Sequence, residues 1–205
     1  MSKINWKGGA LLAPVPPVLV TVGDGERQNV FTVAWTGLIN TQPPKTYISV
    51  RPSRYSYDFI KETGEFALNL TPTSLVRAAD WCGIHTGRKV NKFEKMNLTP
   101  TEASIIGAPI IEECPMALEC KVFDMIELGT HHMFLADIVA VDVNEELLDS
   151  AGRLHIDRAD LAAFAHGEYF SLGKSLGTFG FSVKKKKKHK AKAPAKAVDK
   201  GHRKV

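Results

Sequence analysis

The sequence predicts a mainly β fold, an antiparallel barrel with helical insertions. Strand-like segments come first, helical segments interrupt them, and strand-like segments return through a hairpin. This order differs from the repeated strand-helix-strand units of a doubly wound parallel sheet. The chain has 205 residues, of which 44% are hydrophobic and 24% charged. Because that composition is ordinary for a globular protein, we expect one domain with a core of its own.

The first predicted elements are strands. Val18–Val22 is rich in β-branched residues and ends at the turn signal Gly23-Asp24-Gly25. Asn29–Asn40 is a second β-rich run, and the two are expected to form an antiparallel pair. Tyr47–Val50 is predicted as a third strand, which ends before Pro52.

Two helices are expected between the strands of the first half. Ser53 is predicted to cap a helix that carries Tyr57 and Ile60 at helical spacing and ends at Gly64. A strand follows at Phe66–Leu70. The second helix begins after Pro72. Its expected apolar face is Leu75, Ala79 and Cys82, with Val76 beside it.

A polar segment and a β-rich half follow. Gly83–Met96 is predicted to be a loop with a helical turn. Met116–Leu128 and Met133–Val143 are long β-rich runs on either side of Gly129-Thr130-His131-His132, which has the form of a hairpin connection. The segment Tyr169–Val183 is rich in glycine and aromatic residues.

The charge is divided unevenly along the chain. The formal net charge is +5, but residues 184–205 carry eleven Lys or Arg residues against one Asp. The remaining residues, 1–183, are therefore acidic. The sequence predicts a folded domain over 1–183 and a Lys-rich disordered tail over 184–205, because the tail has little apolar surface to bury.

Composition also narrows location and partners. No stretch is apolar and long enough to span a membrane, and the first residues lack the features of a signal peptide, so a cytoplasmic protein is expected. Cys82, Cys114 and Cys120 lack the spacing of a redox pair or a zinc site and are expected to be reduced and buried. The tail could bind nucleic acid nonspecifically, but the acidic body argues against a nucleic-acid-binding domain.

Several catalytic motifs are absent or misplaced. Neither the G-x-G-x-x-G dinucleotide fingerprint nor the phosphate-binding P-loop occurs, and there is no H-E-x-x-H zinc motif. Gly173–Gly177 matches G-x-S-x-G, but the only later histidines are His189 and His202 in the tail, so a hydrolase is not expected. His131 and His132 are neighbours in a strand region and should point to opposite faces, which makes a shared metal ion unfavourable.

A set of motifs spread from about Pro14 to Val183 resembles the flavin-reductase-like proteins, including flavoredoxins. The motifs are Asn29–Thr36, Pro43-Pro44, Ser49–Ser56, Phe66–Leu70, Ala79-Asp80, His85–Arg88, Lys92-Phe93, Gly129–Phe134 and Gly173–Phe181. The resemblance implies an antiparallel FMN-binding split β-barrel that works as a homodimer, with the flavin at the subunit boundary. It also implies NADH or NADPH as the electron donor. The final electron acceptor stays open.

The resemblance also assigns candidate binding residues. It implies that Thr32, Ala34, Trp35 and Thr36 contact the isoalloxazine and ribityl parts of FMN. It implies that the phosphate contacts fall on Arg51, Ser53 and Arg54, with Ser56 nearby.

The residue types fit these roles independently. Two arginines and a hydroxyl at a strand-to-helix junction are suitable donors for a phosphate. Thr86, Gly87 and Lys89 form a second group of hydroxyl, backbone and cation that could close over the phosphate or the ribityl chain.

His131 is the candidate catalytic residue. It matches the family's hairpin histidine and could contact the flavin or the nicotinamide, or donate a proton to the reduced flavin. The function expected is that of an NAD(P)H-dependent flavin reductase or a flavoredoxin-like electron carrier. The alternatives are an FMN-binding protein of the same fold without reductase activity, and a nucleic-acid-binding protein that acts through its tail.

Overall fold

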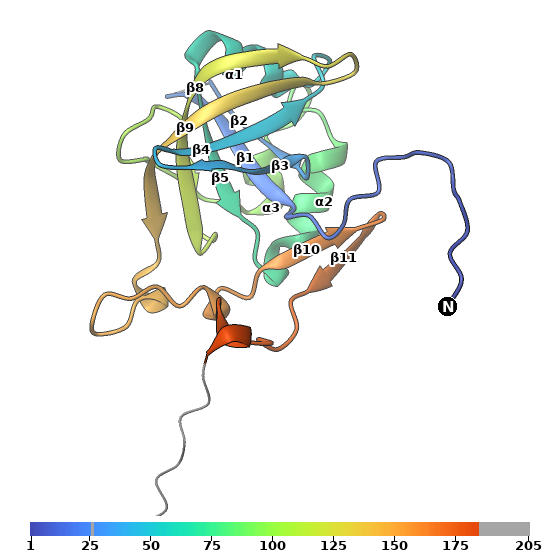
Figure 1. Ribbon diagram of the computed structural model, residues 1–205. Coiled ribbons are helices and arrows are strands. Elements are labelled where there is room, and N and C mark those ends of the chain that lie inside the picture. Colours follow the sequence, from blue (N-terminus) through green and yellow to red (C-terminus); the bar gives the residue numbers. More distant parts are fainter. Residues whose placement is uncertain (26, 185–205) are drawn as a thin grey trace, which may run out of the picture. The chain divides into compact units, whose positions relative to one another are not determined.

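The computed structural model describes residues 1–25 and 27–184 (Figure 1). The chain divides into two compact units, Met1–Gly173 and Lys174–Val205. The predicted Lys-rich tail lies outside the described residues except for Lys184. Among the described residues no helix is long and apolar enough to cross a membrane.

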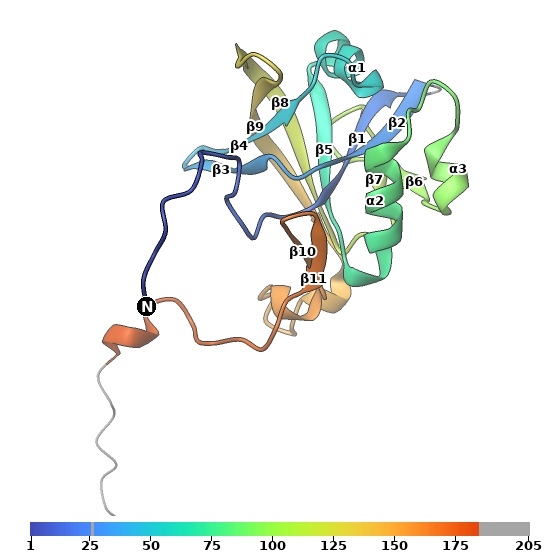
Figure 2. The ribbon, with the colours of Figure 1, turned by 90° about the vertical axis from the view of Figure 1, so that its right-hand side faces the viewer.

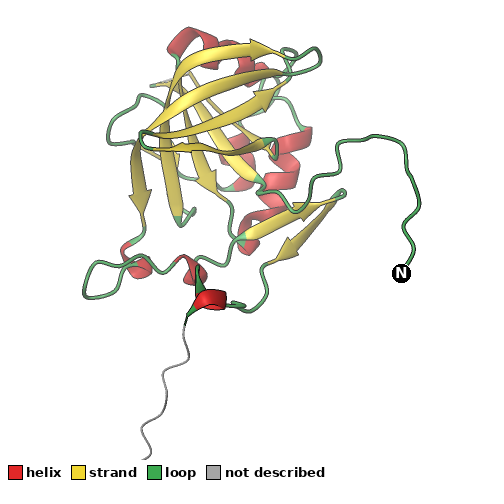
Figure 3. Ribbon diagram, in the orientation of Figure 1, coloured by secondary structure: helices red, strands yellow, loops and turns green. Residues whose placement is uncertain are grey.

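A curved seven-stranded antiparallel sheet forms the centre of the first unit (Figures 1 and 3), as predicted. Its strand order is β2-β1-β5-β8-β9-β4-β3. The strands are β1 Val18–Asp24, β2 Arg27–Val33, β3 Thr36–Thr41, β4 Pro44–Val50, β5 Glu65–Leu70, β8 Met116–Glu127 and β9 His132–Val143. Two short antiparallel pairs accompany it, β6 Pro100–Thr101 with β7 Ile110–Ile111, and β10 Ala162–Ala165 with β11 Glu168–Ser171.

The concave side of the sheet encloses the main core. Buried side chains from six strands meet there with apolar residues of helix α1, Tyr55–Thr63. Phe66, Ile48 and Phe134 are almost fully buried in this cluster. Burying an aliphatic or aromatic side chain stabilises the folded state by about 1.5–3 kcal/mol. Because the strands share this core, it holds their ends in fixed positions.

The β-rich run Asn29–Asn40 is two strands rather than one. β2 ends at Val33 and pairs with β1, whereas β3 begins at Thr36 and pairs with β4. These two strands are neighbours in the sequence but lie at opposite ends of the strand order. The backbone must therefore leave one sheet edge and join the other across Ala34 and Trp35.

Helix α1 follows the end of β4 through a tight turn. The predicted cap at Ser53 was wrong, because Arg54 is the N-cap and no side chain caps this helix. The Arg54 N–H donates to the Arg51 carbonyl across 2.9 Å. The predicted end at Gly64 is confirmed: this residue has a φ of 67° and its N–H donates to the Ile60 carbonyl.

Two further helices, α2 Val76–Ile84 and α3 Lys92–Met96, pack beside β2 (Figure 2). A 3₁₀ turn at Thr73–Leu75 leads from Pro72 into α2. The predicted face is confirmed at Ala79 and Cys82, which are fully buried, and Leu75 packs against the same cluster. The helical turn expected within Gly83–Met96 is α3, whose N-cap Asn91 accepts hydrogen bonds from the backbone of Phe93 and Glu94.

Candidate functional site

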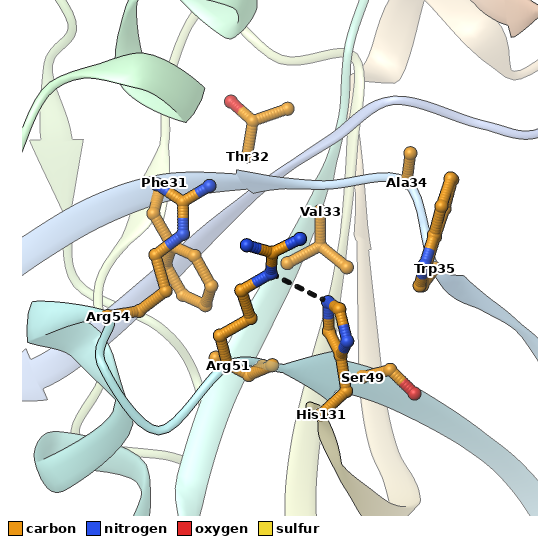
Figure 4. Close-up of a pocket in the computed structure, with 10 residues that line it drawn as sticks. Phe31, Thr32, Val33, Ala34, Trp35, Ser49, Arg51, Arg54 and His131 are labelled. Atoms are coloured by element: carbon orange, nitrogen blue, oxygen red, sulfur yellow. Dashed lines mark hydrogen bonds between the residues drawn. The ribbon is translucent and has the colours of Figure 1, made fainter. Parts of the chain in front are cut away.

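A cavity of about 320 Å³ lies where β2 and β4 end. β2 and the connection after it contribute one wall, β4 and the turn after it contribute a second, and the β8–β9 hairpin supplies one residue. The lining residues are Phe31, Thr32, Val33, Ala34, Trp35, Ser49, Val50, Arg51, Arg54 and His131. Figure 4 shows Arg51 beside His131, with Trp35 and Arg54 at opposite sides of the view.

A second cavity of about 240 Å³ adjoins the first and shares Phe31, Arg51 and Arg54 with it. It lies between the start of α1 and the segment that joins α2 to α3. Its other lining residues are Asn29, Ser53, Tyr55, Ser56, Ile84, His85, Thr86, Gly87 and Lys92. Together the two cavities form one elongated site.

The second cavity is rich in cations. Arg51, Arg54 and Lys92 line it, and among the described residues neither cavity is lined by an Asp or a Glu. Arg54 donates from its guanidinium to the Gly83 carbonyl across 2.6 Å, and Lys92 donates from Nζ to the Cys82 carbonyl across 2.7 Å. Positive charge without a carboxylate partner favours an anionic ligand.

Most of the predicted binding residues are brought together here. Thr32, Ala34, Trp35 and His131 line the first cavity, Ser53, Ser56, Thr86 and Gly87 line the second, and Arg51 and Arg54 line both. The Thr32 hydroxyl donates to the Ala79 carbonyl and so ties β2 to α2.

Two predicted residues lie outside the lining of both cavities. Thr36 is buried, and its hydroxyl donates to the Tyr47 carbonyl across 2.6 Å, where it holds β3 against β4. Lys89 is exposed, and its N–H makes a long 3.4 Å hydrogen bond to the Thr86 carbonyl.

Sequence reasoning missed Lys92 as a site residue. This lysine is only 3% exposed, although lysine is among the residues least often buried. The sequence signal for Lys92 is Asn91. An asparagine that caps a helix fixes the direction of the helical turn that follows, and Lys92 is the first residue of that turn. Phe31, Asn29 and Tyr55 were also missed as lining residues.

Gly87 makes the close approach of its loop to β2 possible. A Cβ added at this position would lie 2.2 Å from Asn29 Oδ1 and 2.7 Å from Tyr55 Cδ1. The Asn29 amide in turn donates from Nδ2 to Ser56 Oγ across 2.7 Å. Both Asn29 and Tyr55 line the second cavity, so the absence of a side chain at Gly87 sets the shape of this cavity.

The hydrogen bonds of His131 identify its tautomer. Arg51 Nε lies 3.4 Å from His131 Nε2, and Thr130 Oγ1 lies 2.9 Å from Nδ1. Because a guanidinium only donates, Nε2 is the acceptor and the proton of the neutral ring is on Nδ1. Burial lowers the pKa of His131 below its usual value, and the cations Arg51 and Arg54 lower it further. The His131 ring is therefore neutral at neutral pH, and its Nε2 lone pair is already engaged by Arg51.

The neighbouring His132 has a different environment. Its Nδ1 lies 2.7 Å from the Tyr57 hydroxyl, and the two rings pack edge to face. The prediction that the two histidines point in different directions is confirmed.

Comparisons with known proteins agree with this geometry. The structure matches the flavoredoxin of Desulfovibrio vulgaris (Miyazaki F) with a TM-score of 0.83 and 33% identity, covering 89% of this chain and 100% of that one. This match confirms the predicted split barrel.

Two curated enzymes are also similar. The FMN reductase (NADH) RutF of Pseudomonas syringae is 27% identical over 63% of this chain and 70% of its own length. The NADPH-flavin oxidoreductase of Streptomyces viridifaciens is 28% identical over 68% of each chain. The model of the flavin reductase like domain matches residues 11–173. The chain therefore belongs to the family of proteins with a flavin reductase like domain.

Proposed function

We propose that the protein is an FMN-binding oxidoreductase, either an NAD(P)H-dependent flavin reductase or a flavoredoxin-like electron carrier. The observation that carries this proposal is the pair of adjoining cavities with different chemistry. One has an aromatic and main-chain wall that ends at Trp35, and the other has three cations and several hydroxyls. A ligand with a flat ring system at one end and a phosphate at the other matches both halves.

The lining residues match the two ends of FMN. Val33, Ala34 and Trp35 provide apolar and main-chain surface for the isoalloxazine, while Arg51, Ser53, Arg54 and Lys92 provide donors for the phosphate. When bound, FMN would supply the redox chemistry by accepting a hydride from a reduced nicotinamide. The predicted contacts of Thr36 and Lys89 with the flavin stay predictions.

In this proposal the protein binds and orients the flavin and shields it from water, and no side chain acts as a nucleophile. Arg51 has a double role, because it lines both cavities and also donates to His131. That contact holds the imidazole at the wall of the first cavity, with Nε2 as its acceptor. Because Nε2 has one lone pair and Arg51 occupies it, the predicted contact of His131 with a bound flavin or nicotinamide, and proton donation to the reduced flavin, stay predictions.

Flavin content and its reduction test the function directly. We expect the purified protein to bind FMN, and the flavin absorbance to bleach when NADH or NADPH is added without oxygen, as followed by stopped flow. The names of the relatives support both nicotinamides as donors. FMN binding without bleaching by either donor would favour the alternative, an FMN-binding protein without reductase activity. Failure to take up FMN would overturn the proposal.

We further propose a homodimer with the flavin at the subunit boundary. The support is the exposed apolar surface of β3 beside Trp35: Leu38 is 76% exposed and Ile39 46%. We expect light scattering to give twice the mass of one chain, and Leu38→Glu to weaken both association and FMN binding by about tenfold or more. Ile156→Glu is the matched control, an exposed isoleucine in a 3₁₀ turn. A monomer that binds FMN normally would contradict the proposal.

A cytoplasmic location is proposed as well. Its support is that Cys82, Cys114 and Cys120 are free thiols in the structure, which fits a reducing compartment.

A further inference from the structure

Residues 102–109, here called the covering segment, lie between β6 and β7 on the side of the sheet opposite to the main core. Ile106 and Ala108 of this segment are buried against Ala67 of β5. Ala67 lies between two strand residues that point into the main core, so it faces the other side of the sheet. Because this apolar contact is small, polar groups are needed to hold the covering segment in place.

The main polar anchor of the covering segment is Glu119 of β8, which is fully buried. Its Oε2 accepts hydrogen bonds from the N–H groups of Ile105 and Ile106 across 2.8 and 2.9 Å. Its Oε1 accepts from the Ser104 N–H across 2.8 Å and also from the Ser104 hydroxyl. Burial opposes the charge of Glu119, but these hydrogen bonds outweigh burial and hold its pKa below the usual value. Glu119 is therefore a buried carboxylate.

A second carboxyl group lies beside it. Across β8 and β9, Ala117 is opposite Asp142 and Glu119 is opposite Ala140, so the two acidic residues are diagonal neighbours on one face of the sheet. The Asp142 carboxyl is within hydrogen-bonding reach of Glu119. Its Oδ2 is buried and has no hydrogen-bond partner among the described residues. Two adjacent buried carboxylates, one of them without a donor, are strongly unfavourable. A proton on Asp142 removes the repulsion and turns this group into a donor toward Glu119.

We propose that Glu119 and Asp142 share one buried proton and form a pH-sensitive clamp on the covering segment. In the protonated pair Asp142 is neutral, and the Glu119 carboxylate holds the three backbone N–H groups of the segment. When the proton leaves to solvent at higher pH, the two negative charges repel each other. The two carboxylates then also compete for the Ser104 hydroxyl, which lies within reach of both. Neither acidic residue lines a flavin cavity, so the inference does not depend on the proposed function.

The charged groups around the pair do not neutralise it. Among the described residues neither member of the pair forms an ion pair. The next cation on β8 is Lys121, whose ammonium lies 3.3 Å from Glu65 Oε1 of β5. Asp137 of β9, which is opposite Lys121, pairs with Lys45 of β4. Glu102 of the covering segment is exposed. The proton is therefore the remaining means of removing the repulsion within the pair.

The direction of the pH effect follows from linkage. Burial raises the pKa of Asp142, and the charge and hydrogen bond of Glu119 raise it further. An aspartate in an unfolded chain titrates at about pH 4. The stability that Asp142 contributes is therefore present at low pH and is lost as the pH rises from about 4 through its raised pKa. Glu119 has the opposite sign, since its contribution is lost only as the pH falls below about 4. Above about pH 5 the change within the pair is that of Asp142.

The first experiment measures the melting temperatures of the unmodified protein and of Asp142→Asn from about pH 5 to about pH 8. Asparagine has nearly the same shape, and its amide donates to Glu119 without titrating. We expect the variant to gain about 3 °C or more relative to the unmodified protein as the pH rises. The control is Asp124→Asn, an exposed carboxyl of the same strand, whose difference from the unmodified protein should stay constant. A constant difference for Asp142→Asn would overturn the proposal.

Infrared spectroscopy tests the proton directly. At about pH 5.5 most exposed carboxyl groups are ionised. We expect the difference spectrum between the unmodified protein and Asp142→Asn to contain the carbonyl band of a protonated carboxyl group, and the difference spectrum with Asp124→Asn to lack it. Absence of the band in the first spectrum would overturn the shared proton, whatever the melting temperatures show.

Hydrogen exchange tests the clamp. After correction for base catalysis, we expect the amides of Ser104, Ile105 and Ile106 to exchange about tenfold faster or more at pH 8 than at pH 5 in the unmodified protein. Their corrected rates in Asp142→Asn should stay constant. Equal pH dependence of these amides in both proteins would show that the proton does not control the covering segment, and would overturn the clamp.

Discussion

The double variant Arg51→Ala, Arg54→Ala is expected to lose FMN affinity by about 100-fold or more while binding riboflavin nearly as before. Both guanidiniums line the second cavity, and two charge-assisted contacts to a phosphate are removed at once. Titration of the two flavins followed by fluorescence quenching measures the effect. The comparison isolates the phosphate, since riboflavin has the same ring system.

Arg77→Ala is the control for this variant. Arg77 is an exposed arginine of α2 that does not line either cavity, so its removal changes the net charge without touching the site. Equal losses of FMN and riboflavin in the double variant would contradict the assignment of the phosphate to these arginines. Such a result would indicate that the change had disturbed the fold instead.

Gly87→Ala is expected to destabilise the protein by about 1–3 kcal/mol and to weaken FMN binding. The new Cβ cannot fit within 2.2 Å of Asn29 Oδ1, so either the loop or the Asn29 side chain must move. Both movements change the second cavity, because Asn29 and Gly87 line it. Urea denaturation gives the free energy of unfolding, and flavin titration gives the loss of affinity.

Gly173→Ala provides the matched control. A Cβ at Gly173 meets nothing within 4 Å, and its φ is not in the left-handed region, so this substitution should be nearly neutral. If Gly87→Ala were as stable as Gly173→Ala and bound FMN equally well, the close packing of the loop against β2 would not be needed for the site.

The sequence was sufficient to predict the sheet and most of the site. Strands such as Val18–Val22 and Tyr47–Val50 have local β-rich patterns and appear in the structure as β1 and β4. The candidate residues that line the cavities belong to short contiguous motifs. When the fold brings two such motifs side by side, all of their residues come close to one another. The Asn29–Thr36 and Ser49–Ser56 motifs supply eight of the predicted residues, and all of these except Thr36 line a cavity.

The misses have non-local causes. The local sequence of Asn29–Asn40 does not indicate that its two halves pair with different strands. That pairing depends on the positions of β1 and β4 in the folded chain. Lys89 and Lys92 both lie in the segment predicted as a loop, Gly83–Met96, and the helical turn capped by Asn91 is what brings Lys92 rather than Lys89 to the cavity. Ser53 has the chemistry of a cap, but the turn that ends β4 makes Arg54 the N-cap.

The position of the first cavity connects ligand uptake to the order of folding. Its walls come from β2 and β4, and in the sheet these two strands are separated by β1, β5, β8 and β9. The β3–β4 hairpin already brings the Ser49 N–H to the Trp35 carbonyl, 2.9 Å away. The remaining part of β2 is fixed against β4 only when the intervening strands have paired, and such long-range pairings are slow to form. Flavin fluorescence during refolding should therefore report the last assembly step of the barrel, later than any signal of strand content.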